Sequence, residues 1–83
     1  MTVTWLEGDP AVPPRVAYAI GHRAGGAVVR NRIRRRLRAI IFEVRARLRP
    51  GAYLVGASAA AASLSYEELR ATVCQALAAV HQR

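Results

Sequence analysis

A long segment without glycine or proline, residues 27–48, is the feature that most constrains the fold of this chain. Gly25 and Gly26 precede it, and Pro50 and Gly51 follow it, so helix-breaking residues mark both of its ends. Apolar side chains recur within it at helical spacing, at Val29, Ile33, Leu37, Ile40, Ile41, Val44 and Leu48. Such a stripe is typical of a helix that packs on a sheet. We therefore predict one long amphipathic helix over residues 27–48.

Three shorter segments predict strands. Residues 2–6 and 15–20 are rich in β-branched, aromatic and alternating apolar side chains, and a loop dense in turn-forming residues separates them. We expect these two strands to form an antiparallel pair. Residues 52–57 form a short apolar run that suits a buried strand. Residues 58–64 are expected to be an alanine-serine linker of little intrinsic structural preference.

A capping box indicates a second helix. Ser65 and Glu68 stand in the Ser-x-x-Glu relation, in which a hydroxyl and a carboxylate satisfy free backbone N–H groups. Apolar residues follow at helical spacing, at Leu69, Val73, Leu77 and Val80. The predicted order is therefore β-β-α-β-α. In a chain of 83 residues this order favours an α/β (α+β) fold, a small two-layer sandwich with a thin core in one domain.

The charge of the chain is strongly unbalanced. It has 13 basic residues against five acidic ones, a formal net charge of +8, and every basic residue is an arginine. A polyanionic partner is the usual reason for such an excess, and nucleic acid is the first candidate. Because 53% of the residues are hydrophobic, the chain is expected to fold rather than to be a disordered basic tail.

Most of this charge belongs to the predicted long helix. Arginine fills six of the nine positions from Arg30 to Arg38. On a helical wheel Asn31, Arg34, Arg35, Arg38, Arg45 and Arg49 fall opposite the apolar stripe, and Arg30, Arg32 and Arg36 lie nearer its edges. Guanidinium groups bind phosphate in bidentate fashion and stack on bases, and the release of counterions adds affinity. We therefore predict that this helix binds folded RNA.

Two other interpretations of the arginines are weaker. A merely solvated face would carry balanced charges, but only Glu43 lies within the helix to offset the arginines, so like charges repel one another. A helix lying on an anionic membrane would use the same arginines on head groups. That interpretation is disfavoured because the predicted strands give the stripe a protein core to cover, and the stripe lacks aromatic anchors.

No catalytic or metal site is expected in the chain. Its acidic residues are Glu7, Asp9, Glu43, Glu67 and Glu68, and none makes a persuasive catalytic pair. His22 lies in a basic loop expected to contact phosphate, and Cys74 is expected to be a small buried hydrophobic residue. With no apolar run long enough to span a bilayer and no signal-peptide pattern, we expect a cytoplasmic protein without a membrane partner or bound cofactor.

Residues 25–38, Gly-Gly-Ala-Val-Val-Arg-Asn-Arg-Ile-Arg-Arg-Arg-Leu-Arg, resemble the bacterial ribonuclease P protein component. The signature of that family is a Gly-x-Ala-Val-x-Arg-Asn-Arg segment that continues into basic residues. The likeness extends upstream over residues 15–20 and downstream over residues 52–57 and 64–69, and so covers nearly the whole chain.

The resemblance implies a ribonucleoprotein. In this family a catalytic RNA removes the 5′ leader from precursor tRNA with the help of magnesium, and the protein binds that RNA and the leader. The residues implied to bind RNA are Arg30, Asn31, Arg32, Arg34, Arg35 and Arg38, and we also expect an RNA contact from Arg23 in the basic loop before the helix. The resemblance also implies that the long helix joins two parallel strands by a left-handed crossover, an exception to the usual right-handed rule.

The chain departs from the family pattern in three places. It starts at about the strand that follows the family's basic, aromatic N-terminal helix, so we expect a shortened subunit in which Trp5 and Tyr18 are possible leader contacts. From the residues alone, these two aromatics are expected to be half-buried sheet residues. The family usually has Ser-Lys-Lys where this chain has residues 21–23, and a basic residue where it has residues 58–59.

Three alternative functions remain. One is a non-catalytic module that binds another structured RNA, and another is an inactive truncated copy of the subunit. The third is an independent nuclease, for which the sequence offers no residues.

Overall fold

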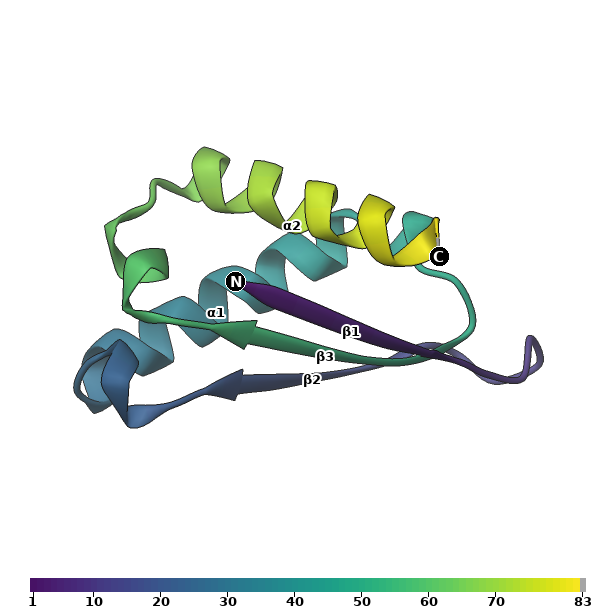
Figure 1. The fold of residues 1–83 in the computed structure, drawn as a ribbon, viewed down its shortest axis with the longest axis horizontal. Coiled ribbons are helices and arrows are strands. Elements are labelled where there is room, and N and C mark those ends of the chain that lie inside the picture. Colours follow the sequence, from purple (N-terminus) through teal and green to yellow (C-terminus); the bar gives the residue numbers. More distant parts are fainter. Residues whose placement is uncertain (83) are drawn as a thin grey trace.

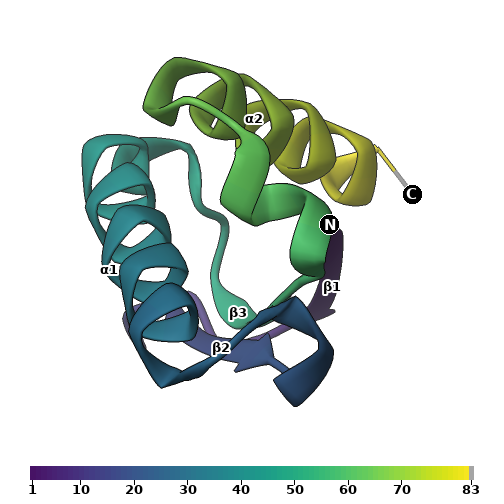
Figure 2. The ribbon, with the colours of Figure 1, turned by 90° about the vertical axis from the view of Figure 1, so that its left-hand side faces the viewer.

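Two α-helices cover one face of a three-stranded sheet (Figures 1 and 2). The structure is a computed structural model that describes residues 1–82. The elements are β1 (Thr2–Glu7), β2 (Arg15–Ile20), α1 (Ala27–Glu43), β3 (Gly51–Ala57) and α2 (Tyr66–His81). Short 3-10 helices lie at His22–Ala24, Arg45–Arg47 and Ala59–Ser63. The predicted order β-β-α-β-α and the two-layer α/β sandwich are confirmed.

The strands are arranged in the order β1-β3-β2, with β3 in the centre. β3 is antiparallel to β1 and parallel to β2, so Val55 lies opposite both Val3 and Tyr18. The predicted antiparallel pair of β1 with β2 is therefore wrong. β3 is the strand whose inward side chains are most completely buried, Tyr53 at 3% and Val55 at 0% exposure. A central position gives these side chains neighbours on both sides, which an edge position would not.

α1 connects the parallel strands β2 and β3 by a crossover. In Figure 1 both strands point to the left, β3 lies above β2, and α1 lies behind the sheet. A chain that follows this path turns in the left-handed sense, whereas nearly all such connections are right-handed. The left-handed crossover implied by the family resemblance is thus present.

The hydrophobic core lies between the sheet and the two helices. From the helices it takes both predicted stripes, with Ile33, Leu37 and Ile40 of α1 and Leu69, Val73 and Leu77 of α2 all buried. From the sheet it takes Val3, Ile20, Tyr53 and Val55. Every second side chain of each strand points into this core, so the register places the intervening residues on the opposite face of the sheet.

The long helix is shorter than predicted. α1 ends at Glu43, and after Val44, whose φ and ψ are −100° and 13°, the chain continues as the 3-10 helix Arg45–Arg47. Val44 is buried at 3% exposure and Leu48 packs against the core, so the predicted apolar stripe continues beyond the observed end of α1. Arg45 and Arg49 therefore do not belong to the α1 surface.

The start of α2 is as predicted, and the segment before it is ordered by packing. The Ser65 hydroxyl accepts the N–H of Glu68, and the Glu68 carboxylate accepts the N–H of Ser65, which confirms the capping box. The alanine-serine linker over residues 58–64, expected to have little intrinsic structural preference, contains the 3-10 helix Ala59–Ser63. Ala61 of that helix is buried, and this packing gives the segment the order that its weak intrinsic preferences do not indicate.

Candidate nucleic-acid interface

One side of α1, here called the arginine face, consists of Asn31, Arg34, Arg35 and Arg38. Arg34 is half-buried and the other three side chains are exposed. Together with Val28 they line a shallow hollow of about 400 Å³. Because the opposite side of the helix is anchored in the core, these guanidinium groups are presented to solvent on a rigid element. The structure thus brings together four of the residues predicted to bind RNA.

Asn31 orients one of these arginines. Its Oδ1 accepts a hydrogen bond of 3.1 Å from Nη1 of Arg34, one helical turn away. A guanidinium has five N–H donors, so this contact leaves the remaining donors available while it restricts the side chain. An asparagine between arginines therefore orders the surface without adding negative charge.

Arg30, Arg32 and Arg36 border the arginine face. Arg32 is exposed and lines a second hollow of about 420 Å³ with Arg35, Arg36, Ala39 and Tyr66. Arg36 donates from Nη1 to the carbonyl oxygen of Leu64 at 3.0 Å, and so ties α1 to the segment before α2. Arg30 is half-buried, and its Nε is buried without a hydrogen-bond partner among residues 1–82. Of these three, Arg32 is the one most open to a ligand.

The charge of the arginine face is not neutralised by the acidic residue on α1. Glu43 accepts hydrogen bonds of 2.9 Å from the Tyr66 hydroxyl and from Nε of Arg70, both on α2. Both hydrogen bonds lower the pKa of the Glu43 carboxyl, and the hydrogen bond from Arg70 also raises the pKa of the Arg70 guanidinium. Within residues 1–82 this is the only ion pair. Glu43 therefore stabilises the contact between the two helices and leaves the arginines without a counter-charge.

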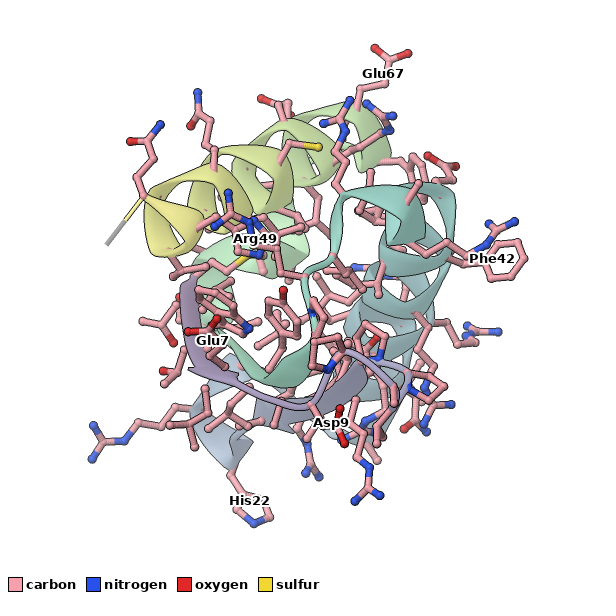
Figure 3. The ribbon with its side chains drawn as sticks, turned by 90° about the vertical axis from the view of Figure 1, so that its right-hand side faces the viewer. Glu7, Asp9, His22, Phe42, Arg49 and Glu67 are labelled. Carbon is pink, nitrogen blue, oxygen red and sulfur yellow. The ribbon has the colours of Figure 1, made fainter. Side chains whose placement is uncertain are left out.

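The N-terminus of α1 adds partial positive charge to the same region. Gly26 is its N-cap, without a side-chain cap, and the first turn has no acidic residue. Its free N–H groups and the helix dipole both favour an anion. A glycine is needed at position 25, where the chain turns into α1, because its φ is +139° and an added Cβ would lie 2.9 Å from Cγ1 of Val29. Arg23 and His22 are exposed just before this turn, and Figure 3 shows His22 pointing away from the body of the molecule.

Trp5 and Tyr18, the possible leader contacts, point toward the helix-covered face of the sheet. Trp5 is half-buried, stacks on Tyr53 with ring centroids 6.1 Å apart, and donates from Nε1 to the carbonyl oxygen of Pro50 at 3.3 Å. Tyr18 is half-buried under Arg38, whose Cζ lies 5.9 Å from the ring centroid, and burial raises the pKa of its hydroxyl. Both aromatics are the half-buried sheet residues expected from the sequence. Their contact with a leader stays a prediction.

The opposite face of the sheet is covered by no element of residues 1–82, and sequence reasoning missed it as a surface. Its exposed residues are Thr2, Thr4, Leu6, Arg15, Ala17, Ala19, Ala52 and Leu54. The small alanines of β2 alternate with larger inward residues, and this alternation was the sequence signal that could have indicated an uncovered face. Without the strand order, however, it could not show which side chains of the three strands share a face.

The acidic side chains are dispersed. Figure 3 shows Glu7 and Asp9 beside β1 and the loop that follows it, and Glu67 away from them beside α2. Asp9 accepts the N–H of Ala11 within its loop, at 2.9 Å. In the part of the chain that the structure describes, no three His, Cys, Asp or Glu side chains lie close enough together to hold a metal ion. Across residues 1–82, none of the helices combines the length and the apolar character that crossing a bilayer requires.

Comparison with known proteins identifies the family. The family model described as Ribonuclease P matches residues 1–81. The ribonuclease P protein components of Symbiobacterium thermophilum and Thermobifida fusca are 42% and 45% identical over 69 residues, which is 82% of this chain and 60% and 47% of theirs. That of Beutenbergia cavernae is 47% identical over 47 residues, which is 57% of this chain and 40% of the relative. The chain thus spans 40–60% of the length of these curated relatives.

The fold agrees with this assignment. A structure of a Staphylococcus aureus RNase P protein mutant superimposes with a TM-score of 0.83 at 18% identity, over 95% of this chain and 67% of the other. A second structure of that protein gives a TM-score of 0.78. The left-handed crossover, the arginine face of α1 and the family match over residues 1–81 lead to one conclusion: this chain belongs to the ribonuclease P protein family.

Proposed function

We propose that the chain acts as the protein subunit of ribonuclease P. In this role it binds the catalytic RNA and assists the removal of the 5′ leader from precursor tRNA in the cytoplasm. Family membership supports the proposal, and one observation carries it: the arginine face of α1 is rigid, exposed and without a counter-charge, because Glu43 is bound to α2. Such a surface fits a polyanion of defined shape.

The arginines would act by binding phosphates rather than by chemistry. Arg34, Arg35 and Arg38 present several N–H donors along about one and a half helical turns, a geometry suited to bidentate phosphate contacts. The free N–H groups at the start of α1 would donate hydrogen bonds to a further phosphate, with Arg23 beside them. The cleavage itself is assigned to the RNA, and the magnesium of the reaction is proposed to be held by the RNA and its substrate.

The protein would help most when magnesium is scarce. Catalytic RNA and precursor tRNA are both polyanions, so their association requires counter-charge. A subunit with a formal charge of +8 supplies part of that counter-charge and releases condensed counterions when it binds. The expected effect is a lower magnesium requirement for cleavage.

For the leader, the proposal includes the predicted contacts Trp5 and Tyr18. Both rings point toward the helix-covered side and belong to the edge strands β1 and β2, so a leader would contact them at the edges of the sheet. The uncovered face, with Arg15 at its edge, offers an additional surface for an unpaired strand.

The test is the cleavage of precursor tRNA by a bacterial ribonuclease P RNA at low magnesium, with and without the chain. The variant is Arg34→Ala/Arg35→Ala, because these side chains are on the arginine face and have no role in the core. Arg47→Ala is the matched control, since that exposed arginine contacts Cys74 at the other end of the helix pair. We expect wild type and control to restore cleavage and the double variant to fail. Equal binding of the RNA to wild type and double variant would refute the proposal.

A further inference from the structure

Phe42 lies in line with the arginine face and is not part of the core. It follows Arg38 by four residues, so both side chains are on the same side of α1. Its side chain is 65% exposed, and Figure 3 shows it pointing away from the molecule. Single exposed apolar residues are common and need no explanation by themselves. What distinguishes Phe42 is its position next to the C-terminal end of the arginine face.

A guanidinium is stacked on this ring. The Cζ of Arg45 lies 3.9 Å from the ring centroid of Phe42, and its Nη1 donates to the carbonyl oxygen of Phe42. This pairing depends on the end of α1 at Glu43, because the following 3-10 helix places Arg45 over the ring. With the guanidinium in place the ring is still largely exposed, so it offers an aromatic surface with a cation beside it.

Core packing does not account for an aromatic residue here. The neighbouring Ile41 fills the core position at this level of α1, with 7% exposure. Among residues 1–82, Phe42 pairs with no other aromatic ring, and the group stacked on it is the Arg45 guanidinium. A phenylalanine in this position therefore stabilises the fold little, and its replacement is expected to leave the thermal stability nearly unchanged.

We propose that Phe42 and Arg45 form a stacking platform for an unpaired base of the RNA whose backbone lies on the arginine face. The proposal rests on the proposed function and extends it by one recognition element. Aromatic rings beside basic side chains are the usual means by which proteins hold unpaired bases, because every base has a π-face that can stack. Along the helix axis, Asn31 and Phe42 are about 16 Å apart, so one RNA strand can reach both.

The test compares two RNA probes, a hairpin with a short unpaired tail and the same hairpin with a blunt end. Binding is measured by fluorescence anisotropy for wild type, Phe42→Ala, Phe42→Leu and Phe42→Trp. We expect Phe42→Ala and Phe42→Leu to weaken binding of the tailed hairpin about tenfold, which is within the range for the loss of one stacked base. Binding of the blunt hairpin should not change. Phe42→Trp should keep full affinity because a larger ring also stacks.

Two controls separate this proposal from the proposed function. Arg34→Ala/Arg35→Ala should weaken binding of both hairpins, because it removes phosphate contacts. Val12→Ala, which shortens an exposed apolar side chain in the β1–β2 loop, should change neither. If the arginine variant loses RNA while Phe42→Ala binds the tailed hairpin like wild type, the platform is refuted and the RNA-binding role stands. If wild type binds neither hairpin, the platform is refuted, and the cleavage assay decides the proposed function separately.

Discussion

The hydroxyl of Tyr53 in β3 lies 2.7 Å from Nε2 of His81, the last residue of α2. The same hydroxyl accepts the N–H of Arg49 at 2.8 Å and reaches the carbonyl oxygen of Arg49 at 3.0 Å. In return, Nη1 of Arg49 donates to the carbonyl oxygen of His81 at 3.2 Å. The rings of His81 and Trp5 form a T-shaped pair, with centroids 5.0 Å apart. This cluster fastens the end of α2 to the sheet and to the chain that leads into β3.

The His81 cluster predicts that stability depends on pH. Burial, and secondarily the nearby Arg49 charge, lower the pKa of His81 below its ordinary value in the folded chain. The unfolded chain therefore binds more protons just below about pH 6.5, so stability is fully present above that pH and declines as the pH falls toward the folded pKa. Thermal midpoints measured between about pH 8 and pH 5.5 should fall for wild type and fall less for His81→Gln.

An equal fall in both proteins would show that another group is responsible. Glu43 and Glu68 are not such groups, because hydrogen bonds lower the pKa of each carboxyl. Their stabilising contributions are lost only at pH values below about 4.5, under the window of the measurement.

Gly25→Ala should destabilise the fold. The φ of +139° is strained for any residue with a Cβ, and the added methyl group would meet Val29. We expect a loss of about 1–3 kcal/mol in the free energy of unfolding, measured by urea denaturation. Gly21→Ala is the matched control, because nothing lies within 4 Å of the Cβ it would add. If both variants lose the same amount, the conformation of Gly25 is not the cause.

Ser65→Ala should weaken the start of α2. It removes the hydroxyl that accepts the N–H of Glu68 and so breaks the capping box. The expected cost is about 0.5–2 kcal/mol in the free energy of unfolding. Ser63→Ala, a change at an exposed serine of the preceding 3-10 helix, is the comparison. A cost no larger than that of the comparison would mean that tertiary packing alone holds the first turn of α2.

Arg35→Ala should reduce the salt dependence of RNA binding. The exposed guanidinium borders both hollows on α1, so it is placed to neutralise a phosphate. In a plot of log affinity against log salt concentration, the slope should become shallower by about one unit. Arg47→Ala should leave the slope unchanged, since Arg47 lies on the far side near Cys74. If neither variant changes the slope, the RNA does not contact the chain at Arg35.

Much of this fold could be predicted because its elements have strong local signals. The stripe from Val29 to Leu48 and the capping box at Ser65 depend on residues close together in sequence, and both are present. The strand pairing could not be predicted in this way. The loop between β1 and β2 contains good turn-formers, which favours a hairpin, but the choice of partner depends on how all three strands pack against the two helices. That packing, which buries Tyr53 and Val55 of β3, arises only in the assembled core.

The sequence predicted which residues line the candidate interface, but it predicted only part of their arrangement in space. Asn31, Arg35 and Arg38 are exposed on α1 as the helical wheel indicates. Arg45 was assigned to the same helix because no glycine or proline marks its true end, and the structure instead places Arg45 over Phe42. The partial burial of Arg30 could not be foreseen either, since it depends on how closely α1 approaches its neighbours.

The central position of β3 has a consequence for the synthesis of the chain. β1 and β2 emerge from the ribosome first, yet each pairs only with β3, so the sheet cannot assemble until residues 51–57 are available. α1 needs only local hydrogen bonds and can form earlier, while its arginines still repel one another and its apolar side has nothing to cover. Under the proposed function, RNA bound at that stage would offset the repulsion and so stabilise the folded chain.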